Sequence, residues 1–159
     1  MDRRRFFLGS AAVLALGLGG CGARAEEEEF PVSLSEKEWR DRLTADAFAV
    51  LRQEATERPF TSPLLEIKEA GDFLCAGCDN PLYASSTKYD SGTGWPSFYA
   101  AMDGSVGTKT DYVLVYPRTE VHCAQCGGHL GHIFDDGPPP TGKRHCINGV
   151  ALRFEAREA

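Results

Sequence analysis

The sequence lacks an apolar run long enough to cross a membrane comfortably. Its longest run, Phe6 to Leu18, contains one serine and spans about 13 residues, whereas a membrane-spanning helix needs roughly 20. Three arginines at positions 3–5 precede it. A basic stretch ahead of a short apolar run is typical of an export signal, which we predict over residues 1–20. A buried helix of the folded domain is the alternative, and the arginines count against it.

Two short motifs refine this export signal. Arg3-Arg4 with Phe6 resembles a twin-arginine signal, although Asp2 stands where that signal usually carries Ser or Thr. Leu18-Gly19-Gly20-Cys21 resembles a lipobox, whose cysteine is lipidated and becomes the new N-terminus. We therefore expect an exported protein, either periplasmic or anchored through Cys21 as a lipoprotein facing the envelope. A passive cysteine in a cleaved signal is the alternative.

Positive charge is also scarce. The chain carries 17 basic and 23 acidic residues, a net charge of -6, and residues 21–159 alone carry 14 against 22. Four glutamates, Glu26–Glu29, fall in a segment over residues 21–33 that we expect to be a solvated acidic tether. Such a chain repels polyanions, so we expect no nucleic-acid partner.

Internal repeats are missing, and long helices are not expected. Seventeen glycines and nine prolines favour short strands between turns. Ser35 and Glu38 fit a capping box for a helix ending near Leu43, and Thr44 caps a second helix over residues 45–55. Short β-type runs follow, at Phe73–Cys75, Pro81–Ala84, Tyr112–Tyr116, Thr119–Cys123, His129–Phe134 and Cys146–Phe154. These patterns predict one mainly β, antiparallel domain over residues 34–159, with two N-terminal helices.

Four of the six cysteines form two C-x-x-C pairs, Cys75 with Cys78 and Cys123 with Cys126. Four thiolates make a closed tetrahedral site of the structural kind, so we predict one zinc ion per chain, clamping two separate hairpins. Two disulfides are one alternative. A redox-active pair is another, but such a pair normally begins a helix, and neither pair here is predicted to do so.

Cys146 has no partner at metal-ligand spacing. It lies between Arg144-His145 and Asn148, and neighbouring cations favour the reactive thiolate form of a cysteine. Composition alone favours an inert buried cysteine at this position.

Four segments in a fixed order resemble the methionine-(R)-sulfoxide reductases of the type B family. They are Arg58–Thr61, Lys88–Phe98, Gly128–Phe134 and Gly142–Asn148. With both C-x-x-C pairs, the resemblance runs from about Leu34 to Phe154. It implies a mainly β fold of two antiparallel sheets, a β-tent, with two short N-terminal helices and a structural four-cysteine zinc site.

The resemblance also implies roles for single residues. The implied catalytic residues are Cys146 as nucleophile with His132, His129 and Asn148 around the sulfoxide oxygen. The implied substrate-binding residues are Trp95 for the S-methyl group, Phe134 as an aromatic wall and Arg144 beside the thiolate. Core packing of Trp95, and metal binding by the His-x-x-His pair, are the alternatives. Thr93 departs from the family, because many members carry a resolving cysteine there.

The implied activity is reduction of methionine-(R)-sulfoxide in proteins and peptides. Attack by Cys146 would leave a sulfenic acid, which an external thiol such as a thioredoxin-like protein would recycle. We expect a monomer. A non-catalytic zinc module without need of Cys146 is one rival. A cysteine hydrolase is another, disfavoured because no Asp or Asn is evident to orient the histidines.

Overall fold

The structure, a computed structural model, describes residues 29–157. This part of the chain begins with two short helices. They are α1 (Glu36–Arg42) and α2 (Ala45–Gln53). The Ser35 hydroxyl accepts from the backbone N–H of Glu38, whose carboxylate bonds back to Ser35, so the predicted capping box is confirmed. Thr44 caps α2, which ends two residues early because Glu54 turns left-handed at φ 56°. Neither helix, nor any other in residues 29–157, is long and apolar enough to cross a bilayer.

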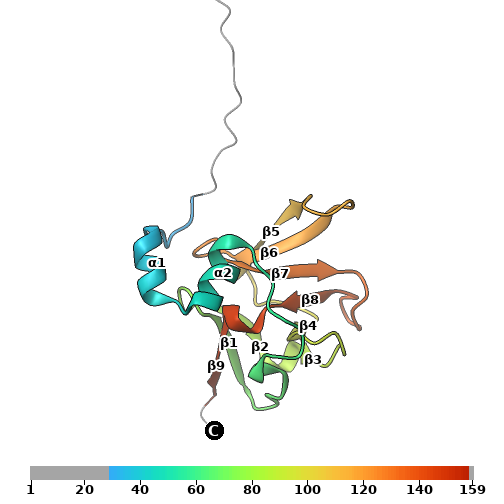
Figure 1. Cartoon of the computed structure of the whole chain (residues 1–159). Helices are drawn as coiled ribbons and strands as arrows, with labels where there is room; N and C mark the ends of the chain where they lie inside the picture. Colours follow the sequence, from blue (N-terminus) through green and yellow to red (C-terminus); the bar gives the residue numbers. More distant parts are fainter. Residues whose placement is uncertain (1–28, 158–159) are drawn as a thin grey trace, which may run out of the picture.

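The strands form two antiparallel sheets (Figure 1). The smaller sheet has the order β2-β1-β9, with β1 (Gly71–Cys75), β2 (Pro81–Ala84) and β9 (Leu152–Ala156). The larger has the order β3-β4-β8-β7-β6-β5, with β3 (Lys88–Tyr89), β4 (Ser97–Phe98), β5 (Val106–Asp111), β6 (Arg118–Cys123), β7 (His129–Phe134) and β8 (Arg144–Ile147). Three 3-10 turns lie at Pro63–Leu65, Ser85–Thr87 and Gly149–Ala151. The predicted mainly β fold is confirmed.

Aromatic side chains join the two sheets. The ring of Phe98, on β4, stacks on Tyr83 of β2 at 4.3 Å between centroids and meets Phe73 of β1 edge-on at 5.0 Å. All three side chains are fully buried. Helix α2 packs against β7 with Phe48 and Leu51 buried, so the core lies between the sheets and this helix.

Two of the predicted strands are wrong. Residues 112–116 form an exposed connection, and the strand precedes them as β5, a polar segment. As an edge strand, β5 pairs only with β6, so its residues need not be apolar. The predicted strand Cys146–Phe154 is split between β8 and β9, in different sheets. The turn between them needs Gly149, whose Cβ would lie 1.9 Å from the Ser62 hydroxyl oxygen.

Candidate functional site

The two C-x-x-C pairs occupy the turns of two hairpins, β1–β2 and β6–β7, one from each sheet. In each turn the carbonyl of the first cysteine accepts from the residue after the second. Asp79 N–H donates to Cys75, and Gly127 N–H donates to Cys123, both at 2.9 Å. Asp79 and Gly127 are both left-handed, at φ 60° and 67°. The two turns therefore share one geometry.

The thiols of these turns meet in one four-cysteine cluster: Cys75, Cys78, Cys123 and Cys126. All four Sγ atoms lie within 4.8 Å of one another, with Cys75–Cys126 at 3.7 Å and Cys78–Cys123 at 3.6 Å. A disulfide needs about 2.05 Å, and the cysteines are free. Metal–sulfur bonds of about 2.3 Å in a tetrahedron place sulfurs about 3.8 Å apart, so the four thiols fit one metal ion.

Cys146 lies near the middle of the larger sheet, on β8. Its cross-strand neighbours are Ser97 on β4 and His132 on β7. A pocket of about 140 Å³ opens beside it. The residues lining this pocket are Thr56, Trp95, Arg118, Gly131, His132, Phe134, Cys146 and Asn148. Five of the site residues expected from the sequence therefore line one small pocket: Trp95, His132, Phe134, Cys146 and Asn148.

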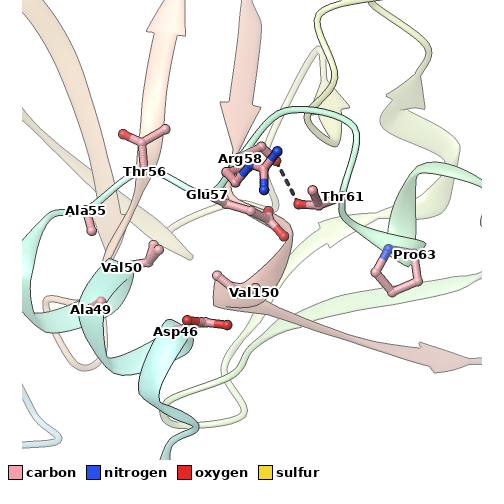
Figure 2. Close-up of a pocket in the computed structure, with 10 residues that line it drawn as sticks. All are labelled: Asp46, Ala49, Val50, Ala55, Thr56, Glu57, Arg58, Thr61, Pro63 and Val150. Atoms are coloured by element: carbon pink, nitrogen blue, oxygen red, sulfur yellow. Dashed lines mark hydrogen bonds between the residues drawn. The ribbon is translucent and has the colours of Figure 1, made fainter.

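One wall of this pocket is the segment after α2. Trp95 Nε1 donates to the Glu57 carbonyl at 2.9 Å, and the Asn148 side-chain oxygen accepts from Glu57 N–H at 2.8 Å. Asn148 Nδ2 donates to the Leu130 carbonyl at 2.9 Å, which leaves one N–H of this amide for another acceptor. A larger cavity of about 460 Å³ lies beside the same segment (Figure 2), and Thr56 lines both.

His132 is held by a carboxylate from the neighbouring hairpin. Its Nε2 lies 2.8 Å from Asp111, which also accepts from Val113 N–H at 2.7 Å and from Arg118 at 2.5 Å. These contacts, the backbone N–H first, hold the pKa of Asp111 well below its usual range. Burial lowers the pKa of His132, against the opposite effect of Asp111. A carboxylate only accepts, so Nε2 carries the proton of the neutral ring.

His129 lies behind His132 and outside the pocket lining. It is buried, its ring meets His132 edge-on at 5.4 Å, and its Nδ1 lies 2.9 Å from the Glu120 carboxylate. Burial would raise the pKa of Glu120, but His129 and Lys109 outweigh it and lower that pKa. The expectation that no Asp or Asn orients these histidines is wrong for His132, which bonds Asp111 of β5. His129 lies beside the carboxylate of Glu120 on β6, without a hydrogen bond of good geometry.

A family model described as the SelR domain matches residues 43–156. The chain belongs to the SelR family of methionine sulfoxide reductases. It is 53% identical over 135 residues to the chloroplastic peptide methionine sulfoxide reductase B1 of Arabidopsis thaliana, covering 84% of this chain and 66% of that protein. It is 51% identical to the rice protein of the same name, over 79% of this chain and 59% of the rice protein. It is 50% identical to the peptide methionine sulfoxide reductase MsrB of Agrobacterium fabrum, over 78% of this chain and 93% of that protein. The chain thus spans less than two thirds of the rice protein, about two thirds of the Arabidopsis one and most of the bacterial one.

The thiol of this SelR domain sits at the end of a hydroxyl chain. Thr93 Oγ1 lies 4.0 Å from Cys146 Sγ and 2.8 Å from the hydroxyl of Ser91, which lies 2.7 Å from that of Ser97. Arg144 lies 4.4 Å above the Phe134 ring and donates from Nε and from one terminal nitrogen to the two carboxylate oxygens of Asp136. It does not line the pocket.

Burial raises the pKa of the Cys146 thiol, and Arg144 and Thr93 only partly oppose this effect. The sequence suggested that neighbouring cations would make Cys146 a thiolate. In the structure its environment instead favours the protonated thiol before substrate binds.

Thr56 of the pocket lining was not singled out from the sequence. Neither were three charged residues of the SelR site: Asp111, Arg118 and Glu120. They are non-local, because β5 and β6 bring them beside β7. One feature of the sequence could have indicated them. Arg118 and Glu120 are two positions apart on β6, so they lie on one face of it. This strand pairs with β7, which carries His129 and His132, and Glu120 is the cross-strand partner of His132.

Proposed function

We propose that the chain reduces methionine-(R)-sulfoxide in proteins and peptides, with Cys146 as the nucleophile. The observation that carries this proposal is one thiol outside the four-cysteine cluster, at a small pocket walled by Trp95, Phe134 and His132. A methionine sulfoxide requires a nucleophile for sulfur, an apolar slot for its methyl group and a proton for its oxygen. Cys146 supplies the first, Trp95 and Phe134 the second, and His132 the third.

The protonation states of Cys146 and His132 supply the one proton that the reaction needs. A protonated Cys146 and a neutral His132 hold one transferable proton between them. As the cysteine sulfur attacks, His132 takes this proton and passes it to the substrate oxygen. The attack forms a transient bond between the Cys146 sulfur and the substrate sulfur. The substrate S–O bond then breaks, and its protonated oxygen passes to the Cys146 sulfur as the sulfur–sulfur bond breaks. The substrate sulfur leaves as a thioether with two more electrons, and Cys146 becomes a sulfenic acid, oxidised by two electrons. Acid–base help of this kind contributes about 100- to 10,000-fold in rate.

Asn148, His129 and Arg144 would support this chemistry from around the pocket. Asn148 has one amide N–H left for the sulfoxide oxygen. His129, packed edge-on against His132 and paired with Glu120, would fix the His132 ring. Arg144 would stabilise the developing thiolate by its charge.

Recycling would use an external thiol. Within residues 29–157 the other four cysteines are all in the cluster. Thr93 Oγ1 lies 4.0 Å from the Cys146 thiol, but a hydroxyl forms no disulfide. A thiol of a thioredoxin-like protein would attack the sulfenic acid and release water, giving a mixed disulfide. A second thiol of that partner would then free Cys146.

The four-cysteine cluster would hold one zinc ion. Thiolates are soft ligands that suit zinc, and four protein ligands leave no open position for substrate. The cluster would therefore have a structural role, tying hairpin β1–β2 of the smaller sheet to hairpin β6–β7 of the larger.

Export is proposed from the N-terminal sequence alone, because residues 1–28, including Cys21, lie outside the described residues. The proposal divides the chain into an export signal over 1–20, an acidic tether over 21–33 and a monomeric reductase domain over 34–159. Lipidated Cys21 would attach the protein to a membrane facing the envelope. Cys21→Ala should release it from the membrane fraction; unchanged attachment would rule out lipidation.

An assay on separated sulfoxide epimers tests the activity. With dithiothreitol as reductant, the protein should reduce the R epimer of a methionine sulfoxide peptide and leave the S epimer untouched. Equal reduction of both epimers, or none, would reject the proposed function.

A further inference from the structure

The connection between β5 and β6 exposes a continuous apolar surface. Five consecutive side chains, Tyr112–Tyr116, are 45 to 106% exposed, and none is charged. Elsewhere in the described part of the chain, only Phe60 is a large apolar side chain with comparable exposure. The connection forms the tip of the outer hairpin of the larger sheet (Figure 1). Contiguous exposed apolar surface of this kind marks interaction sites.

This apolar tip is built onto the Cys146 pocket. Its two ends are the cross-strand pair Asp111 and Arg118. Asp111 bonds His132, and Arg118 lines the pocket. Inside the tip, Val113 N–H donates to Asp111, which fixes the first turn of the connection to the same carboxylate. The tip therefore begins and ends at the rim of the pocket.

The pocket is too small for more than part of a polypeptide. Its volume of about 140 Å³ is well below the roughly 300–1,000 Å³ of pockets that enclose whole small ligands. An oxidised methionine side chain would enter it while the main chain remained outside. The tip starts directly at the rim residues Asp111 and Arg118, and its six residues, 112–117, form a bent connection rather than extended strand. Substrate residues two or three positions from the sulfoxide would reach it.

We propose that Tyr112–Tyr116 is a docking surface for apolar residues that flank the oxidised methionine in a polypeptide substrate. This inference rests on the proposed function and deepens it, because it specifies the substrate class. Methionines sit mostly among apolar neighbours in protein interiors, so the preferred substrates are segments exposed when an oxidised protein loosens. A lipid surface suits the tip less well. The tip has no basic residue, Arg118 at its base is paired with Asp111, and the chain is acidic.

The test compares two peptides that each carry one methionine-(R)-sulfoxide. One has Leu and Val at two and three positions on either side, and the other has Ser and Gly there. The wild-type protein should turn over the apolar peptide with a kcat/KM about tenfold higher, the gain from burying about one aliphatic side chain. In Val113→Ser/Val115→Ser the ratio should fall to about one. Both side chains are at least 80% exposed, so the substitution removes no core packing.

Two control variants separate the tip from general effects. Val113→Leu/Val115→Leu keeps the apolar surface and should keep the tenfold ratio. Phe60→Ser removes the exposed apolar side chain elsewhere and should keep it too. A wild-type ratio in the Val→Ser double variant would overturn the docking proposal while leaving sulfoxide reduction intact. No reduction of either peptide by wild type would instead reject the proposed function.

Flotation with vesicles of phosphatidylethanolamine and phosphatidylglycerol tests the lipid alternative. The wild-type protein and Val113→Ser/Val115→Ser should float to the same extent, because the tip is not needed for any membrane contact. Flotation that the double substitution abolishes, with an unchanged peptide ratio, would overturn the proposal in favour of a membrane surface.

Discussion

The four-cysteine cluster and the Cys146 site use the same element, sulfur, in opposite ways. In the cluster, two turns of one geometry bring four thiols within 4.8 Å, and three of the four cysteines are buried. At the other site a single half-buried thiol opens on a pocket, with a hydroxyl, Thr93 Oγ1, as its neighbour at 4.0 Å. Four thiols this close together fit one metal ion. A lone sulfur facing an apolar slot and a histidine remains free to react.

Removing the lone sulfur should have the largest effect on activity. Cys146→Ser should lower kcat by about 10⁴-fold or more, as loss of a nucleophile does. Zinc content and melting temperature should match wild type, because Cys146 is outside the cluster. Peptide reduction followed by chromatography, with metal analysis, checks both halves. Substantial residual turnover would end the assignment of Cys146 as nucleophile.

Removing one sulfur of the cluster should act on stability instead. Cys123→Ser should lose zinc and lower the melting temperature by about 10 °C or more, since metal binding contributes directly to folding. Differential scanning calorimetry with metal analysis measures this, and Cys146→Ser is the matched control. Wild-type protein that contains no zinc as purified, and whose melting temperature Cys123→Ser leaves unchanged, would contradict a structural metal.

The sequence predicted the two regions unequally. Caps at Ser35 and Thr44, and the C-x-x-C turns, depend on residues a few positions apart, so local sequence identified them. The carboxylates of the reactive site, Asp111 and Glu120, could not be assigned, because strand pairing brings them to β7. The exposed run 112–116 was mistaken for a strand, because apolar composition usually means burial.

Asp111 fixes the tautomer of His132 at the Cys146 site, because its carboxylate accepts from His132 Nε2. The four-cysteine cluster has no such proton-holding pair. Asp111→Asn should lower kcat by about ten- to a hundredfold, because an amide can donate as well as accept and no longer fixes the His132 tautomer. Asp111 raises the pKa of His132. Its loss should lower that pKa further, so the imidazolium form and its limb of the pH–rate profile should move to lower pH. Asp135→Asn, an exposed aspartate paired with Lys143, should leave the profile in place.

Arg144 affects the ionisation of the Cys146 thiol and lies outside the four-cysteine cluster. Its charge lowers the pKa of Cys146 against burial, so Arg144→Ala should raise that pKa and move iodoacetamide labelling of Cys146 to higher pH. Lys143→Ala removes a neighbouring, exposed cation and should not. Peptide-resolved mass spectrometry across pH follows Cys146 alone. Identical labelling profiles for the two variants would show that Arg144 has no electrostatic effect on the thiol.

The substitution with the smallest expected effect on activity is Thr93→Cys. It gives Cys146 a neighbouring sulfur, as each cysteine of the cluster has. Thr93 Oγ1 already lies 4.0 Å from Cys146 Sγ, so a modest shift of the loop would bring a sulfur at that position to the roughly 2.05 Å of a disulfide. One equivalent of sulfoxide should leave the wild-type protein with a dimedone-reactive Cys146. In Thr93→Cys the same treatment should give a disulfide between the new thiol and Cys146, with methionine released in equal yield. Ser91→Cys is the control, because the Ser91 hydroxyl contacts Thr93 and Ser97 rather than Cys146, and it should give no disulfide. In wild-type protein that lacks the signal and Cys21, an intramolecular disulfide would mean that a cluster thiol had left its ligand set to reach Cys146, and the division between the two sulfur sites would fail.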